Sequence, residues 1–350
     1  MELAGIITAS YSPSQCLYLE TKIKHLETLP QPEQRTPEWY TFRNNRLTAS
    51  DFNTVIDEYD KKNTKPNYKL SAKFKDLICK KCGIERPFIK GDAIQHGIKF
   101  ESIATSIYET RNDLTILEFG CLPHQHIPFF GASPDGIVSY TSNNKKYIGR
   151  MLEIKCPKSR PITGIIPPGY FAQMQGQLEV CDLEYCDYLE CDFQFYKSQD
   201  AFFNDTCNSN EPEKLTKIYG NKPFVKTLSG KEKGVILELY NTETKKHIYN
   251  YAPYSVITNK QLFIEWEQTI INSIFTENKT NIEYIGTNYW YLNKYNTVLV
   301  KRKREWFNTN FIKIQHFWNN VLKYRAEGTD TINTKKKYEY KHTNEMEFLN

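Results

Sequence analysis

The feature that most constrains this chain is a pair of short apolar runs that carry charged residues and are separated by a polar turn. The first run ends in Asp135-Gly-Ile-Val, and the second carries Glu153-Ile-Lys155. Residues 141–146 have the composition of a hairpin loop, so the two runs are expected to pair as neighbouring strands. Side chains alternate between the faces of a strand, and Glu153 and Lys155 therefore share one face. The hairpin is expected to bring two carboxylates and one ammonium together on a sheet.

These three charges predict a metal-dependent site. A Glu-x-Lys pair on an exposed strand is normally a solvated ion pair. Here both acids lie in apolar segments, where an unpaired charge would be costly. Two carboxylates bind a hard divalent cation through oxygen, and an ammonium beside them can orient or deprotonate a water and offset charge on a phosphate. The pattern therefore indicates nuclease chemistry.

A third acid lies upstream, in a segment with helical recurrence. Residues 91–112 place apolar side chains at helical spacing, and Glu101 falls inside that stripe. We expect Glu101 to point inward, toward the other two acids. The alternative is a glutamate at the edge of the stripe, paired with Lys99 or Arg111.

Six ordered blocks between residues 38 and 195 resemble one known family, the lambda-exonuclease-like viral recombinases, or alkaline exonucleases, of the PD-(D/E)XK nuclease superfamily. In chain order they are Glu38-Trp-Tyr-Thr-Phe-Arg43, Leu47-Thr-Ala-Ser-Asp51, His96-Gly-Ile-Lys-Phe-Glu101, Ser133-Pro-Asp-Gly136, Leu152-Glu-Ile-Lys-Cys-Pro157 and Tyr170-Phe-Ala-Gln-Met-Gln175. The resemblance implies an α/β fold: a restriction-endonuclease-like core with a mixed central sheet flanked by helices.

The resemblance also implies roles for particular residues. One or two magnesium ions, or manganese in their place, would be held by Glu101, Asp135, Glu153 and the backbone carbonyl of Ile154. Lys155 would assist the attacking water. A pocket for the 5′-terminal phosphate of the degraded strand would be formed by Arg43, Ser50, Ser133 and Gln173.

The residues themselves support part of the phosphate pocket. Ser50 or Thr48 precedes an apolar recurrence and is a good candidate helix N-cap, and a helix N-terminus beside an arginine is a natural phosphate site. Arg43 could clamp a phosphate with two hydrogen bonds. The alternative is that Ser50 only caps the helix and Arg43 only pairs with a surface acid. Gln173 is expected on a helix over 169–180, where its role rests on the resemblance.

A chain of 350 residues with 39% hydrophobic content can bury one large core or a core plus an accessory region. The expected division is an N-terminal extension (1–36), a nuclease core (37–276) with an insertion (197–231), a C-terminal helical accessory region (277–329) and a disordered tail (330–350). Within the core, a hairpin around residue 241 and a helix over 259–275 are expected.

A net charge of +5 is mild and does not by itself identify a nucleic-acid-binding protein. Two basic clusters, one over residues 61–69 and one over 301–304, are candidate DNA contacts or solvated faces. The spacing of Cys79 and Cys82 leaves open a zinc or iron–sulfur site, although reduced core thiols are the simpler explanation. The sequence shows no targeting signal and no run of eighteen apolar residues. A soluble intracellular protein is expected, in the host cytoplasm if the source is a large cytoplasmic DNA virus.

The expected function is a magnesium-dependent DNA exonuclease, acting 5′ to 3′ on linear duplex DNA in recombination, replication or repair of the viral or phage type. One alternative is a structure-specific or restriction-type endonuclease of the same fold, and another is a non-catalytic protein that binds DNA ends. The expected partners are double-stranded DNA ends, a single-strand annealing protein and further copies of the chain, since family members include ring-shaped trimers. No membrane partner is expected.

Overall fold

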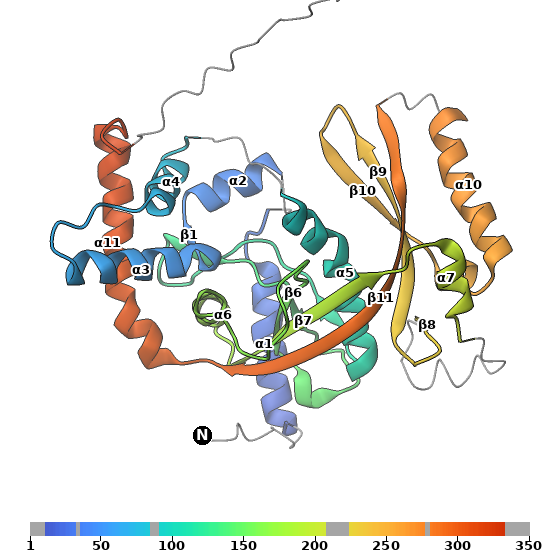
Figure 1. Ribbon diagram of the computed structural model, residues 1–350. Coiled ribbons are helices and arrows are strands. Elements are labelled where there is room, and N and C mark those ends of the chain that lie inside the picture. The colour runs from blue at the N-terminus through green and yellow to red at the C-terminus, as the bar shows by residue number, and fades with distance from the viewer. Residues whose placement is uncertain (1–10, 33–35, 85–90, 208–223, 277–280, 333–350) are drawn as a thin grey trace, which may run out of the picture.

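The computed structural model describes residues 11–32, 36–84, 91–207, 224–276 and 281–332. The fold is mixed α/β, with an eight-stranded sheet in the order β10-β9-β11-β7-β6-β5-β2 and β8 paired to β9 (Figure 1). The strands of this sheet are β2 (Ile116–Leu117), β5 (Gly136–Val138), β6 (Met151–Lys155), β7 (Tyr185–Phe195), β8 (Val225–Lys226), β9 (Glu232–Asn241), β10 (Lys246–Tyr251) and β11 (Ile282–Lys301). The β6–β7 pair is parallel and the other pairs are antiparallel, so the predicted mixed central sheet is confirmed.

Two helices cover opposite faces of the sheet at β6. Helix α5 (Asp92–Asn112) packs against Leu152 and Ile154, whereas α6 (Pro168–Cys181) shares a core with Met151. Odd-numbered residues of β6 therefore face α6. The predicted alternation, which places Glu153 and Lys155 on one face, is confirmed, as are the two helices.

The N-terminal half also contains a three-stranded sheet in the order β1-β4-β3 and the remaining helices and turns. They are α1 (Pro13–Thr28), α2 (Pro37–Asn44), β1 (Leu47–Thr48), the short 3-10 helix η1 (Ala49–Asp51), α3 (Phe52–Thr64), α4 (Ala72–Lys81), β3 (Leu122–Pro123), β4 (Phe130–Ala132) and a second 3-10 turn, η2 (Lys145–Tyr147). Helix α1 buries Ile23 and Leu26 in the main core. The predicted N-terminal extension thus contains a helix that stabilises the core.

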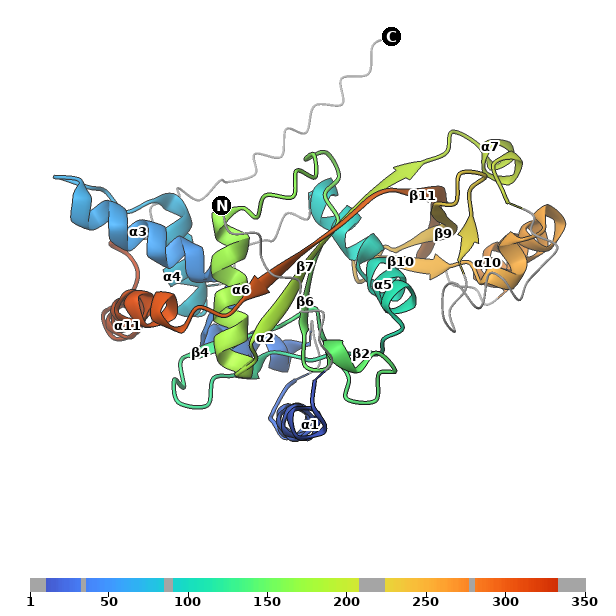
Figure 2. The ribbon, with the colours of Figure 1, turned by 90° about the horizontal axis from the view of Figure 1, so that it is seen from below.

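The prediction of a helical accessory region is wrong for residues 282–301. They form β11, which pairs with β9 and then with β7 and runs from the side of α10 to the side of α6 (Figures 1 and 2). Trp290 and Leu292 lie on the same buried side of this strand. The run is rich in aromatic and β-branched residues, which favour a strand, whereas the apolar helical spacing of this region lies further on, in residues 307–322. The rest of the region is helical as predicted, in α11 (Arg304–Glu327).

The predicted insertion is partly regular structure. It contains α7 (Gln199–Asn204), whose Phe202 is fully buried, and β8, while residues 208–223 lie outside the described part of the chain. The hairpin around residue 241 is confirmed as β9 and β10, followed by α9 (Tyr254–Ile257) and the predicted helix α10 (Lys260–Thr276). The disorder predicted for 330–350 concerns a segment described only to residue 332.

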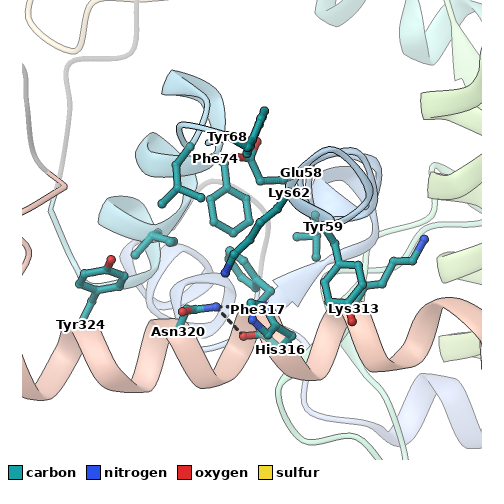
Figure 3. A pocket seen from close by; sticks show the side chains of 13 residues that line it. Glu58, Tyr59, Lys62, Tyr68, Phe74, Lys313, His316, Phe317, Asn320 and Tyr324 are labelled. Atoms are coloured by element: carbon teal, nitrogen blue, oxygen red, sulfur yellow. Dashed lines mark hydrogen bonds between the residues drawn. The ribbon is translucent and has the colours of Figure 1, made fainter. Parts of the chain in front are cut away.

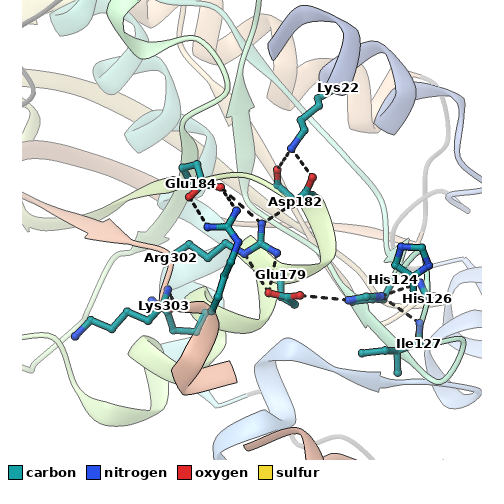
Figure 4. Close-up of polar contacts among 11 residues, drawn as sticks. Lys22, His124, His126, Ile127, Glu179, Asp182, Glu184, Arg302 and Lys303 are labelled. Carbon is teal, nitrogen blue, oxygen red and sulfur yellow. Dashed lines mark hydrogen bonds and ion pairs between the residues drawn. The ribbon is translucent and has the colours of Figure 1, made fainter. Parts of the chain in front are cut away.

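Two residues of the basic run at 301–304 form ion pairs within the protein (Figure 4). Arg302 is 9% exposed and donates to Glu179 at 2.8 Å and to Asp182 at 2.5 Å. Arg304 pairs with Glu184. These contacts join the end of β11 and the start of α11 to the end of α6. Arg302 and Arg304 are therefore committed to acids of the protein itself, whereas Lys301 and Lys303 are exposed.

The nine cysteines form no disulfide, and seven of them, including Cys79 and Cys82, pack in or against the two largest clusters of core side chains. None of the described helices is both long and apolar enough to span a membrane.

Candidate functional site

The pairing of β5 with β6 places Asp135 beside Glu153. In this hairpin Gly136 is opposite Leu152, and Asp135 directly precedes β5. The Asp135 carboxylate accepts a 2.6 Å hydrogen bond from the backbone N–H of Ile154. Apolar residues of both strands fill a core on each face of the sheet, with Ile137 and Met151 on the face of the acids and Leu152 and Ile154 on the other, so the acids are held in buried surroundings. Asp135, Glu153 and Lys155 are called the carboxylate centre below.

Glu153 is the most enclosed member of the carboxylate centre, with no exposed surface. Its Oε1 accepts hydrogen bonds from Lys155 Nζ and, at 2.7 Å, from Gln173 Nε2. Its Oε2 accepts from Gln177 Nε2, also at 2.7 Å. A buried carboxylate with this many donors is held in one position.

The charges of the carboxylate centre act on one another. Burial raises the pKa of Asp135 well above its usual range, and the charges of Glu153 and Glu101 raise this pKa further. Burial alone would lower the pKa of Lys155, but Glu153 and Asp135 outweigh it and raise that pKa. Lys155 is therefore a cation at neutral pH, suited to orienting a water and offsetting negative charge rather than to removing a proton.

Glu101 approaches from α5, on the opposite face of the sheet from Glu153, and is half-buried. Its effect on the pKa of Asp135 places it near that carboxylate. Among the described residues, no three His, Cys, Asp or Glu side chains converge as a preformed metal-binding cluster. Both Glu153 oxygens are instead engaged by Lys155 and two glutamines. The residues still suit a hard cation, because Asp135, Glu153 and Glu101 provide only oxygen ligands.

A second group, called the arginine cluster, surrounds Arg43 at the end of α2. Its guanidinium donates to the hydroxyls of Ser133 at 3.3 Å, Thr48 at 3.3 Å and Ser50 at 3.5 Å, and it lies 4.4 Å from the ring centroid of Trp39. No carboxylate of the described residues lies within ion-pair distance of Arg43. Three of the four residues predicted for a phosphate pocket are thus together, around a half-buried cation with neutral partners.

The capping prediction for Thr48 and Ser50 is wrong. Helix α3 is preceded by η1, Asp51 holds its N-cap position, and neither hydroxyl caps a helix. Thr48 Oγ1 donates to Asp51 Oδ2 at 2.9 Å instead. Both hydroxyls also accept hydrogen bonds from Arg43. This contact comes from the preceding helix, so capping signals at residues 48–51 alone do not predict it.

A buried lysine, Lys81, contacts the backbone of Arg43 and the side chain of Asp51. Lys81 Nζ, fully buried at the end of α4, donates to the backbone oxygen of Arg43 at 3.0 Å and lies 3.6 Å from Asp51. Burial lowers the pKa of Lys81 to about 8. Although burial acts to raise the pKa of Asp51, Lys81 and other donors outweigh it and lower that pKa. The pair therefore remains ionic at neutral pH.

Gln173 contacts the carboxylate centre, because it donates a hydrogen bond to Glu153, and it is not seen to contact the arginine cluster. Gln177, one helical turn later, was missed by the sequence analysis. Its Nε2 also reaches the backbone oxygen of Ser133, at 3.2 Å, and its buried Oε1 has no hydrogen-bond partner among the described residues. Gln177 thus connects the two groups. The spacing of four residues from Gln173 on one helix face was the available signal.

Helix α6 approaches the arginine cluster closely because residue 176 is glycine. A Cβ at Gly176 would lie 3.0 Å from Ala49, 3.1 Å from Phe130 and 3.3 Å from Phe52. A larger residue would push α6, with Gln173 and Gln177, away from η1 and Ser50.

Comparison with known proteins finds a family match over part of the chain. Residues 38–184 match the family described as YqaJ-like viral recombinase domain. An uncharacterized protein of Acanthamoeba polyphaga mimivirus is 31% identical over 338 residues, which is 90% of this chain and 57% of that protein. The chain therefore spans little more than half the length of this relative.

Several solved structures are similar in shape. The alkaline exonuclease LHK-Exo from Laribacter hongkongensis, in complex with dAMP, has a TM-score of 0.45 at 18% identity, covering 83% of this chain and 95% of its own. A phage-related exonuclease from Haemophilus somnus has a TM-score of 0.38 at 11% identity, covering 81% and 94%. A SOX–DNA complex has a TM-score of 0.29 at 10% identity, covering 91% and 72%.

Proposed function

We propose that the chain, whose residues 38–184 match the YqaJ-like viral recombinase domain, is a magnesium-dependent DNA exonuclease that degrades linear duplex DNA from 5′ ends. The observation that carries this proposal is the buried Glu153 beside Asp135, with the cation of Lys155 on the same strand face. Crowded carboxylates and a permanent cation are what hydrolysis of a phosphodiester requires.

The metal would be held by Asp135, Glu153, Glu101 and the backbone carbonyl of Ile154. One or two magnesium ions, or manganese in their place, would supply Lewis-acid activation of a water and of the scissile phosphate. Gln173 and Gln177 hold the Glu153 carboxylate in place from α6. Lys155 orients the water and stabilises the negative charge that develops on the phosphate.

The arginine cluster would bind the 5′-terminal phosphate. Arg43 can form paired hydrogen bonds to a phosphate. Its guanidinium already donates to the hydroxyl oxygens of Ser50 and Ser133. Ser133 lies two residues before Asp135, so a phosphate held there would stand at a fixed distance from the carboxylate centre. This geometry favours release of mononucleotides from a 5′ end over cleavage within a strand. Gln173 would assist from the side of the carboxylate centre.

The biological setting is proposed on the same basis. Processing of DNA ends in viral recombination, replication or repair would leave single strands for a single-strand annealing protein. A ring of several copies could enclose the duplex, and a host-cytoplasmic location would follow from a large cytoplasmic DNA virus as the source.

The test is digestion of end-labelled linear duplex DNA with magnesium, with closed circular DNA in parallel. Mononucleotides released from the linear duplex alone would support the proposal. Efficient nicking of the closed circle would favour the endonuclease alternative, and binding of ends without hydrolysis would favour the non-catalytic one.

A further inference from the structure

A separate cavity of about 180 Å³ lies between α3, α4 and α11, away from the carboxylate centre (Figure 3). Its floor is apolar and includes Phe74 and Phe317, both from the main core. Its rim is aromatic and polar, with Tyr59 on α3, Tyr68 on the following loop and Tyr324 on α11. Rings at the edge of an apolar hollow offer flat surfaces against which another flat group can stack.

Lys62 supplies a positive charge at this cavity. Figure 3 shows its side chain reaching from α3 across the hollow toward Asn320 and His316 on α11. Burial lowers the pKa of His316 and the charge of Lys62 lowers it further, which agrees with their closeness. Within the described residues, no carboxylate lies within ion-pair distance of Lys62. By contrast, Lys313 on the same rim is neutralised by Asp60 at 2.6 Å.

The carboxylate in the lining is already engaged. Glu58 is 4% exposed and accepts hydrogen bonds from the backbone N–H of Ser71 at 2.8 Å and from its hydroxyl at 2.5 Å. Its charge is therefore directed into the loop before α4. Outside the rim, Lys61, Lys65 and Lys69 are exposed and extend the positive surface.

We propose that this cavity and its rim, together called the groove below, bind single-stranded nucleic acid, with one base in the cavity against the tyrosine rings and a neighbouring phosphate on Lys62. Stacking platforms combined with a basic track are the usual means of binding single strands without sequence preference. An acidic peptide would satisfy Lys62 but would leave the flat rings without a matching group. A base fits both the apolar floor and the rings.

The place of the groove in the fold suggests which strand it holds. Helix α3 begins at Phe52, directly after the arginine cluster, and Lys62 lies ten residues further on, roughly 15 Å along the helix axis. A strand whose partner is being degraded could leave the active site and reach the groove. This identity of the strand rests on the proposed function, whereas binding to the groove does not.

The test measures binding without cleavage. A fluorescent thymidine oligonucleotide is titrated with the full chain in the presence of EDTA, so the result does not depend on nuclease activity. Lys62→Glu and Tyr324→Ala are each expected to weaken binding about tenfold. Lys246→Glu, an exposed lysine on β10, makes the same charge change far from the groove and should have little effect. Thermal melting confirms that each variant is folded.

Equal losses in Lys62→Glu and Lys246→Glu would assign the effect to net charge and overturn the proposal. Displacement of the oligonucleotide by polyglutamate as readily as by unlabelled oligonucleotide would overturn it in favour of an acidic protein partner. An oligonucleotide carrying 5-iododeoxyuridine should crosslink to Tyr59, Tyr68 or Tyr324 on irradiation. Crosslinks confined to residues around Ser50 would contradict binding at the groove, even if the chain proves to be a nuclease.

Discussion

The carboxylate centre and the arginine cluster lie next to each other, yet they hold charge in opposite ways. In the first, burial and the neighbouring acids raise the pKa of Asp135, and the same acids keep Lys155 a cation. In the second, the Arg43 guanidinium is surrounded by neutral hydroxyls. The first arrangement suits a metal cation and the second suits an anion. The comparison separates two tasks, hydrolysis and recognition of a strand end, and each can be disturbed alone.

The largest effect is expected from Glu153→Gln, which keeps the volume but removes a buried charge. Hydrolysis should fall by a factor on the order of a thousand or more, because an anionic metal ligand is lost while DNA contacts remain. Initial rates on a 5′-phosphorylated duplex measure this loss, and Asp135→Ala should behave alike. Glu232→Gln, a buried glutamate paired with Arg111 elsewhere, is the matched control. Activity of Glu153→Gln within about tenfold of the parent would remove Glu153 from the catalytic role.

Lys155→Ala should lower turnover by about a hundredfold while metal binding persists, since the lysine stabilises charge and is not a ligand. Turnover at saturating DNA and calorimetric titration with magnesium separate the two effects. Lys158→Ala, an exposed lysine three residues later, should leave both unchanged. Loss of metal binding with normal turnover would contradict the role.

Arg43→Ala should act on the choice of end rather than on hydrolysis itself. The preference for 5′-phosphate over 5′-hydroxyl ends should shrink about tenfold to a hundredfold, the scale of a lost charged hydrogen-bond pair of roughly 1.5 to 3 kcal/mol. The ratio of the two rates is the readout. Arg46→Ala is the control, because Arg46 stacks on Phe42 and is not seen to contact the cluster. An unchanged ratio would separate Arg43 from the terminal phosphate.

Gln177→Leu should have a smaller effect that reaches both groups, because Gln177 contacts Glu153 and the backbone of Ser133. Turnover and the preference between ends are each expected to fall severalfold. Gln175→Leu provides the control: this glutamine is equally buried on α6 but contacts the backbone of Lys301 and Lys303. If both variants lost turnover to the same extent and neither changed the preference between the two ends, Gln177 would be only a packing residue.

The smallest effect concerns stability alone. Lys81 has a pKa of about 8 in the folded protein against 10.5 in the unfolded chain, so the unfolded chain binds more protons between these values. The free energy of unfolding should therefore rise with pH across this window, by about 2 kcal/mol from this residue. In Lys81→Met the contribution should disappear, which denaturant unfolding at pH 7.5 and pH 10 would reveal as a flatter dependence. Equal slopes in both proteins would mean that Lys81 is not perturbed.

The sequence predicted the parts of the fold in which one physical signal dominates. Alternation in 151–155 identified β6 and the shared face of Glu153 and Lys155, and helical recurrence identified α5 and α6. It failed at β11, where pairing with the distant strands β7 and β9 decided the outcome.

The candidate site was predictable to a similar degree. Asp135 and Glu153 were brought together by a local hairpin, which the sequence contains in full. Gln177 was missed and Gln173 was assigned to the arginine cluster because their partners depend on how α6 packs against β6 and η1, a tertiary contact with no local signal.

The most direct test of the division between the two groups is one degradation assay with two substrates. Linear duplexes that differ only in a 5′-phosphate or 5′-hydroxyl are digested by the parent chain with magnesium. The account predicts mononucleotide release from both, faster from the phosphorylated end, with neither degraded by Glu153→Gln and the difference reduced in Arg43→Ala. Equal rates on both ends by the parent chain, or full activity of Glu153→Gln, would contradict it.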